Sequence, residues 1–222
     1  FAALAARDIM SAPVRTLKIK TTVVDALKIM AGKNIKRLPV TADDGTLLGI
    51  VSRTDVLAAI ARASTAAGHL EILPAGLNSP ARDALFTDVP TAGPDTPLAD
   101  ILRQLVRSPL RRVVIIDQER RVLGLVHDWD LLRSFVQTES AGLMDRLVRA
   151  LTQHEQSLPD LDGTARDVMT TDIITARPDA PLAEVIGTLV DRKIKRIVVA
   201  DETGRLLGMV DRDAVLKALA RQ

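Results

Sequence analysis

The chain has no cysteine and no tyrosine, a single tryptophan, and an aromatic content of only 2%. The lack of thiols excludes disulfide bonds and thiolate chemistry, which agrees with the cytoplasmic location that we expect. The scarcity of aromatic rings excludes a stacking platform for single-stranded nucleic acid. All apolar runs are far shorter than a bilayer requires, so we expect no membrane insertion of this segment.

The composition that remains is typical of a globular protein, with 47% hydrophobic and 26% charged residues in a chain of 222. The net charge is +2 and the pI is about 9.2. This mild basic excess is not concentrated in a stripe or a recognition helix, and we therefore predict no nucleic-acid partner. The chain begins at Phe1 without a signal-peptide pattern, and we expect it to be part of a longer protein.

The sequence carries no pattern that is typical of an active site. Its three histidines, His69, His127 and His154, are scattered along the chain. There is no glycine-rich phosphate loop and no HExxH spacing. We predict that the chain is not an enzyme, and that it has neither a resident cofactor nor a metal site.

One stretch recurs three times: LLGIVSRTDVL begins at residue 47, VLGLVHDWDLL at 122 and LLGMVDRDAVL at 206. The copies align without gaps, at offsets of 75 and 159 residues from the first. Each copy contains a short extended segment, an amphipathic helix with apolar residues at i, i+3, i+4 and i+7, two strands joined by a turn, and a last helix. The predicted order is β-α-β-β-α, which is a mixed α/β (α+β) fold.

The repeats divide the chain into five segments. Copy 1 covers residues 1–62, copy 2 covers 81–136 and copy 3 covers 165–222, with linkers at 63–80 and 137–164. Apolar spacing in the second linker predicts an extra packing helix. A single copy has too small a core to be stable alone, so its sheet needs another copy or a partner to cover it.

Three motifs keep a constant spacing within the copies. Each copy starts with Arg-Asp before two apolar residues, continues with a basic pair before a strand (IKRLPV, LRRVVI and IKRIVV), and ends with the glycine stretch quoted above. Together these motifs resemble CBS domains, named after cystathionine β-synthase, over about three quarters of the chain. The resemblance implies tandem units that pack in pairs through their sheets as Bateman modules. Such modules commonly hold adenine nucleotides or related adenosyl ligands in a cleft, and they regulate enzymes, channels and transporters.

The polar part of the repeated stretch has two interpretations in copy 1. Ser52 and Asp55 have the spacing of a capping box at a helix N-terminus. The same geometry suits a ribose phosphate, because a helix N-terminus attracts phosphate and a carboxylate binds ribose hydroxyls. Following the resemblance, Asp55 would hold the ribose, while Ser52 and Arg53 would face the phosphate of an AMP-, ADP- or ATP-like ligand.

The other two copies depart from this pattern. Copy 2 keeps the acid as Asp130 but has His127 in place of the hydroxyl, and a histidine can also donate to phosphate. We expect Trp129, between them, to pack at the module surface. Copy 3 has Asp211 and Ala214 at the two positions, so a carboxylate would repel phosphate and the ribose acid is missing. We therefore predict that copy 3 holds no nucleotide in the usual way and that Asp211 only caps a helix.

Basic pairs and threonines complete the predicted site. Adjacent strand residues point to opposite faces, so at most one residue of each basic pair can face a given cleft, and the alternative is a solvated strand end. The resemblance implies phosphate contacts from the basic pairs and pocket contacts from the threonines of copies 1 and 2: Lys36, Arg37, Arg111, Arg112, Thr16, Thr21, Thr91 and Thr96. The pair Lys195 and Arg196 occupies the same place in copy 3.

The predicted pairing of the copies follows from the acids. Because Asp55 and Asp130 are both present, we predict that copies 1 and 2 form the ligand-binding module. Copy 3 would then pair with copy 3 of a second chain, giving a homodimer, or with a fourth copy outside this chain. The predicted function is non-catalytic sensing of an adenosyl ligand in the cleft between copies 1 and 2. The alternative is a ligand-free dimerisation scaffold for an effector domain.

Overall fold

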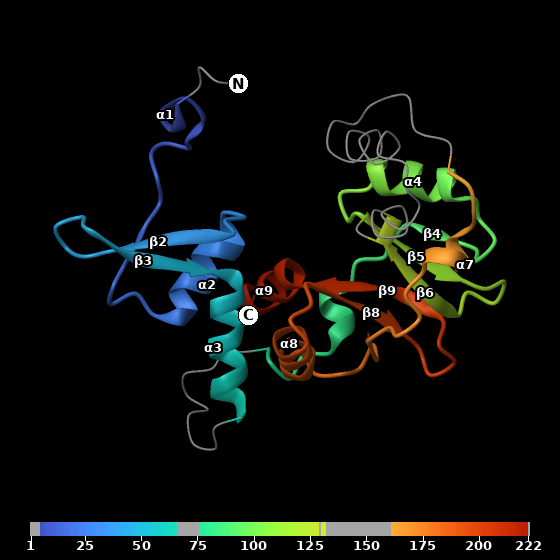
Figure 1. Ribbon diagram of the computed structural model, residues 1–222. Helices are drawn as coiled ribbons and strands as arrows, with labels where there is room; N and C mark the ends of the chain where they lie inside the picture. The colour runs from blue at the N-terminus through green and yellow to red at the C-terminus, as the bar shows by residue number, and fades with distance from the viewer. Residues whose placement is uncertain (1–4, 66–75, 129, 132–160, 222) are drawn as a thin grey trace. The chain divides into compact units, whose positions relative to one another are not determined.

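The computed structural model describes residues 5–65, 76–128, 130–131 and 161–221 (Figure 1). Trp129, His69, His154 and the helix predicted in the second linker lie outside the described residues. The chain divides into two compact units. Unit 1 consists of Phe1–Asn78, Leu182–Ile194 and Arg212–Gln222, and unit 2 of Ser79–Pro181 and Lys195–Asp211.

Each copy forms one three-stranded sheet, in which the central strand pairs parallel with the first strand and antiparallel with the third. The strands are β1 (Leu17–Lys18), β2 (Arg37–Thr41), β3 (Leu47–Ser52), β4 (Thr91–Ala92), β5 (Arg112–Ile116), β6 (Val122–His127), β7 (Thr175–Ala176), β8 (Arg196–Ala200) and β9 (Leu206–Asp211). The described helices are α1 (Ala6–Ile9), α2 (Val23–Gly32), α3 (Arg53–Thr65), η2 (Ala81–Ala84), α4 (Leu98–Arg107), α7 (Ala165–Val168), α8 (Leu182–Asp191) and α9 (Arg212–Ala220). The predicted mixed α/β fold class is confirmed.

The three sheets share one register. In each, the basic residue that begins the central strand lies opposite the residue that begins the polar stretch: Arg37 opposite Ser52, Arg112 opposite His127, and Arg196 opposite Asp211. In each sheet, the register between the central and the third strand shifts by one residue at the last pair. This irregularity occurs at the same position in all three copies. The repeated sequence therefore places equivalent polar side chains at the same end of every sheet.

The sheets of copies 2 and 3 pack on each other within unit 2. Their facing side chains form one apolar cluster of Val114, Leu125, Val198, Leu206 and Met209. The predicted pairing of copies 1 and 2 is therefore wrong, since the sheet face of copy 2 is covered by copy 3. The apolar sheet faces decide which copies pair. The prediction had rested on the polar residues Asp55 and Asp130, which lie at the strand ends and do not contribute to these faces.

Backbone hydrogen bonds relate copies 2 and 3 by a local two-fold symmetry. Phe86 and Met209 exchange N–H···O bonds of 3.0 Å in both directions, and Thr170 and Leu125 exchange equivalent bonds of 2.8 and 2.9 Å. The first pair joins the start of copy 2 to β9, and the second joins the start of copy 3 to β6. Each copy thus lays its starting segment against the third strand of the other.

The starting segments also enter the partner's core. Ala165 N donates to Thr96 O at 2.9 Å, and Ala81 N donates to Ala180 O at 2.8 Å, again as a symmetric pair. Leu161 and Ala165 belong to the same buried cluster as the apolar stripe of α4, made of Leu98, Ile101, Leu102 and Leu105. The core of copy 2 is therefore completed by residues at and just before the start of copy 3.

In unit 1, helices α8 and α9 of copy 3 pack against the helices of copy 1, α9 beside α2 and α8 beside α3 (Figure 1). Arg53 forms an ion pair with Asp213, and Arg212 Nη1 donates to Thr54 Oγ1 at 2.7 Å. Copy 3 thus uses its sheet with copy 2 and its helices with copy 1. The predicted dimer through copy 3 is wrong, because the sheet face that it requires is already covered.

Candidate ligand-binding site

The strand ends of unit 2 bring charged residues of two copies together. We call Arg112, His127, Asp130, Arg196 and Asp211 the strand-end cluster. Register places Arg112 beside His127 and Arg196 beside Asp211. The two halves meet because Arg196 Nη1 donates to Leu110 O, two residues before Arg112, at 3.2 Å.

The strand-end cluster brings two guanidinium groups close to each other beside the carboxylates of Asp130 and Asp211. Burial and, to a smaller extent, the nearby Arg196 guanidinium lower the pKa of the Arg112 guanidinium to about 10, although Asp128 and Asp130 oppose the shift. Arg196 Nε lies 3.7 Å from Asp211 Oδ2, and both side chains are only 21% exposed. Two half-buried guanidinium groups close to each other favour an additional anion beside them.

Two buried guanidinium nitrogens near the cluster have no hydrogen-bond acceptor among the described residues. They are Arg196 Nε and Nη1 of Arg111, the residue before Arg112. Buried polar groups in folded proteins are almost always paired, and an unpaired one calls for a water, an ion or a ligand. Because these donors are charged, an acceptor such as phosphate would bind strongly.

His127 and Asp130 form the capping interaction of copy 2. The carboxylate oxygen Asp130 Oδ2 accepts from the backbone N–H of His127 at 2.8 Å and lies 2.9 Å from His127 Nδ1. The imidazole of His127 thus contacts Asp130 in copy 2, as the hydroxyl of Ser52 contacts Asp55 in copy 1. This interaction orients both side chains at the start of the helix that follows β6.

Ser52 and Asp55 form a complete capping box in copy 1. Asp55 N donates to Ser52 Oγ at 3.3 Å, and Ser52 N donates to Asp55 Oδ2 at 2.8 Å. The hydroxyl and backbone N–H of Ser52 hold the pKa of the Asp55 carboxyl below its usual value. Arg37 lies opposite Ser52 in the sheet, and both Lys36 and Arg37 are exposed.

Arg53 does not face a ligand, contrary to the prediction. Its side chain is buried, Nε donates to Ile35 O at 3.0 Å and Nη2 donates to Asn34 Oδ1 at 3.0 Å. The ion pair with Asp213 uses the third nitrogen. The guanidinium therefore fastens the start of α3 to the turn before β2 and to α9.

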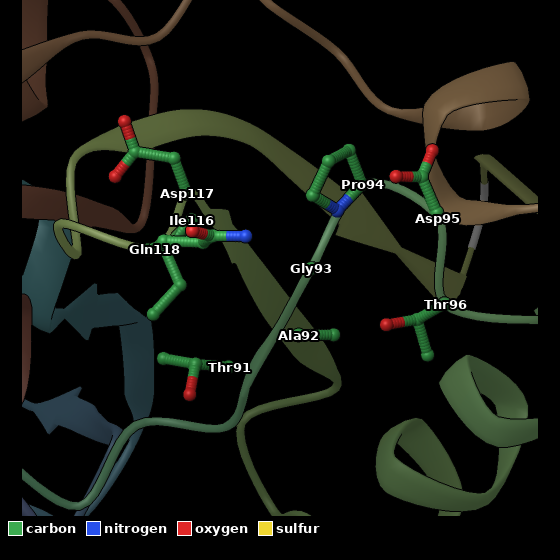
Figure 2. A pocket seen from close by; sticks show the side chains of 9 residues that line it. All are labelled: Thr91, Ala92, Gly93, Pro94, Asp95, Thr96, Ile116, Asp117 and Gln118. Atoms are coloured by element: carbon green, nitrogen blue, oxygen red, sulfur yellow. The ribbon is translucent and has the colours of Figure 1, made fainter.

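The structure places the predicted threonines away from the arginines of the strand-end cluster. Thr91 and Thr96 line a pocket of about 600 Å³ together with Asp95 and Asp117 (Figure 2). This pocket lies beyond the C-terminal ends of β4 and β5, whereas Arg112 begins β5. Its walls include two carboxylates, of which Asp95 pairs with Arg166 at 2.9 Å and Asp117 accepts from the backbone N–H of Arg121 at 2.7 Å.

The two threonines predicted for the site in copy 1 do not lie in the same cavity. Thr21 lines a cavity of about 270 Å³ that also includes Asp55, while its other walls are mostly apolar. Thr16 is exposed and does not line this cavity. Ser52, Lys36 and Arg37 are likewise absent from the walls of the cavity.

The sequence analysis did not include Arg196 in the site, because copy 3 lacks the acidic residue that was expected to bind the ribose. The signal was its position, which matches that of Arg112 in the repeat. Within the described part of the chain, no three histidine, aspartate or glutamate residues gather as a metal site would require. No helix in that part combines the length and apolar character needed to span a bilayer.

Comparison with known proteins agrees with the three copies. The family model of the CBS domain matches residues 6–62, 81–137 and 165–221. Protein MJ1225 of Methanocaldococcus jannaschii is 26% identical over 215 residues, which cover 96% of this chain and 69% of that protein. The homoserine O-acetyltransferase of Methanohalobium evestigatum is 29% identical over 126 residues, which cover 57% of this chain but only 23% of that enzyme.

Two solved structures share the fold over almost the whole chain. The crystal structure of MJ1225 aligns with a TM-score of 0.59 and 24% identity, covering 95% of this chain and 69% of that one. A conserved protein from Pyrococcus horikoshii aligns with a TM-score of 0.67 and 23% identity, covering 95% and 80%. At these identities the similarity establishes the fold alone, and the chemistry of the site has to be argued from its own residues.

Proposed function

The chain belongs to the CBS domain family, and on that premise we propose that unit 2 is a regulatory module that binds the phosphate of an adenosyl ligand at the strand-end cluster. The observation that carries this proposal is that two buried guanidinium nitrogens, Arg111 Nη1 and Arg196 Nε, have no hydrogen-bond acceptor among the described residues, with Arg196 Nε 3.7 Å from Asp211 Oδ2. Arg112 follows Arg111 in the sequence, and its pKa is lowered by burial and by Arg196. An anion would supply the missing acceptor and compensate the charge.

The ligand would be an AMP-, ADP- or ATP-like molecule. Its phosphate would accept hydrogen bonds from Arg112 and Arg196. Its ribose hydroxyls would donate to Asp130, which His127 already orients at 2.9 Å. The ligand would therefore lie between copies 2 and 3, and not between copies 1 and 2 as the sequence analysis predicted. Binding would regulate an attached domain only through a difference in affinity between two packing states.

Copy 1 offers a second set of residues for such a ligand. Ser52, Asp55 and Arg37 lie together at the end of its sheet, and Lys36 precedes them. Of the threonines predicted for the site, Thr21 lines the cavity beside Asp55 and would contact the adenosine there. Arg53 is left out, because its guanidinium is fully engaged inside unit 1.

A scaffold without ligand is the second candidate function. It is favoured by one observation, that Asp55 and Asp130 already have capping partners. In this case the copies would serve only to join chains or domains. In both cases we propose a non-catalytic protein of the cytoplasm that binds no nucleic acid.

Calorimetry with AMP, ADP, ATP and S-adenosylmethionine tests the two candidates. A ligand at 100 times its Kd should stabilise the fold by about 2.7 kcal/mol, which a thermal shift detects. We expect Arg112→Gln and Arg196→Gln each to weaken binding at least about tenfold, given the strength of charge-assisted bonds. Arg103→Gln is the matched control, because Arg103 is an exposed arginine of copy 2 that pairs with Asp100. No heat with any of the four compounds would favour the scaffold.

A further inference from the structure

The residue that begins the polar stretch has a different chemistry in each copy. It is Ser52 in copy 1, His127 in copy 2 and Asp211 in copy 3, and each lies opposite the arginine that begins the central strand. A hydroxyl does not ionise near neutral pH and a carboxylate is ordinarily charged there, whereas an imidazole ordinarily changes its charge between pH 5 and 8. Of the three copies, only copy 2 therefore places at this position a side-chain type that titrates near neutral pH.

The contact with Asp130 determines which nitrogen of the His127 imidazole can take up a proton. Nδ1 lies 2.9 Å from Asp130 Oδ2. Because a carboxylate only accepts hydrogen bonds, we assign the proton of the neutral ring to Nδ1. Nε2, on the other side of the ring, has no hydrogen-bond partner among the described residues. Nε2 is therefore an acceptor while the ring is neutral, and it becomes a donor when the ring is protonated.

The imidazole lies beside the Arg112 guanidinium on one face of the sheet. Arg112 and His127 are directly opposite each other on β5 and β6, so their side chains leave the sheet on the same side, with Cβ atoms about 4.5–5.5 Å apart. The His127 side chain is 30% exposed, which leaves it accessible to a ligand. A phosphate at the strand-end cluster thus meets a guanidinium that is always charged and an imidazole that is charged only after protonation.

Charges of both signs act on this imidazole. Carboxylates favour its protonated form, and guanidinium groups disfavour it. The carboxylates belong to Asp128 and Asp130 at the start of the next helix and to Asp211 on β9, and the guanidinium groups belong to Arg112 on β5 and Arg196 on β8. A bound phosphate would stabilise all three cationic groups at once. Phosphate binding and protonation of the imidazole therefore favour each other.

We propose that His127 couples ligand binding at the strand-end cluster to the uptake of a proton, and thereby selects adenosyl ligands that carry a phosphate. This inference rests on the proposed function and adds to it the regulation of the same site by pH. With the ring protonated, Nε2 donates to the phosphate that Arg112 also binds. With the ring neutral, Nε2 turns a lone pair toward the phosphate and weakens binding. The proton comes from solvent, and an adenosyl ligand without phosphate gains nothing from it.

Calorimetry with AMP from about pH 6.5 to about pH 8.5 tests the coupling. This range lies above the second pKa of a phosphate monoester, about 6, so AMP itself is mostly dianionic throughout. The Kd of AMP should fall about fivefold or more between pH 8 and pH 6.5, with uptake approaching one proton per AMP. Two buffers that differ in ionisation enthalpy count these protons. Adenosine, which has no phosphate, should bind with a Kd that does not change over the same range.

Variants at two positions assign the proton to the imidazole. His127→Gln should take up no proton on binding AMP and should bind it more weakly at pH 6.5. His127→Ser gives copy 2 the capping pair of copy 1, so it should stay folded and bind AMP with a Kd that does not change with pH. Arg112→Gln is the matched comparison, because it should weaken binding at every pH and still take up the proton.

The outcomes separate this inference from the proposed function. Binding of AMP to the wild type without proton uptake, or proton uptake that persists in His127→Gln, would overturn the coupling and leave the proposed function standing. Absence of AMP binding to both the wild type and His127→Ser across the whole pH range would overturn the proposed function, and the coupling with it.

Discussion

Copy 1 and copy 2 share a sequence frame, a strand order and a register, yet the same positions differ in burial. Ile50 and Leu125 are equivalent, and one is exposed while the other is buried. Arg37 is exposed, whereas the equivalent Arg112 is buried enough to lower its pKa to about 10. The difference comes from the covering sheet of copy 3. Pairing, more than local sequence, turns the end of a sheet into a site with buried charge.

The largest expected effect comes from truncating the paired face. Leu125→Ala should destabilise unit 2 by about 2–5 kcal/mol, because it removes a buried side chain and leaves a cavity between two sheets. Ile50→Ala, the matched change in copy 1, should change the stability of the monomeric chain by less than about 0.5 kcal/mol. Urea denaturation at low protein concentration compares the two. Equal losses would show that the copies do not differ in pairing.

A smaller effect is expected from the repeated glycine. Gly208→Ala should cost about 1–3 kcal/mol, because the new methyl group would overlap the backbone of Phe86 and the segment must shift. Gly49→Ala should leave the unfolding of the monomer unchanged, since its methyl group meets no atom within 4 Å. Thermal unfolding of both variants separates these outcomes, and a strongly destabilised Gly49→Ala protein would contradict the comparison.

The smallest effect concerns the capping box of copy 1. Ser52→Ala should cost about 1 kcal/mol near neutral pH, through loss of the cap on α3. The folded-state pKa of Asp55 is depressed below its usual 3.8, chiefly by the Ser52 hydroxyl. Its stabilising contribution is therefore present above pH 3.8 and is lost as the pH falls through the lower folded pKa. Denaturation from pH 7 to pH 2 should show the gap between wild type and Ser52→Ala closing in acid. A gap that widens in acid would reverse the sign of this coupling.

The sequence allowed the repeated fold to be predicted, because each copy carries its own helix stripe, turn and capping residues. The box of Ser52 and Asp55 depends only on residues three positions apart, and it formed as its spacing indicated. Local signals of this kind are present in the sequence whatever the copy packs against.

The pairing of the copies was not predictable in the same way. Ile50, Leu125 and Met209 are all apolar, so the three sheet faces look alike in sequence and do not specify their partner. Arg53 resembled a phosphate ligand, because the residue that neutralises it, Asp213, is far along the chain and belongs to another copy. Arg196 was missed for a related reason, since its role depends on copy 2 lying beside it.

The cost of truncating equivalent side chains tests the central contrast between a paired and an unpaired sheet most directly. Urea denaturation should show Leu125→Ala losing about 2–5 kcal/mol and Ile50→Ala losing less than about 0.5 kcal/mol. Equal losses would contradict the account, because the equivalent sheet faces of copies 1 and 2 would then be buried alike.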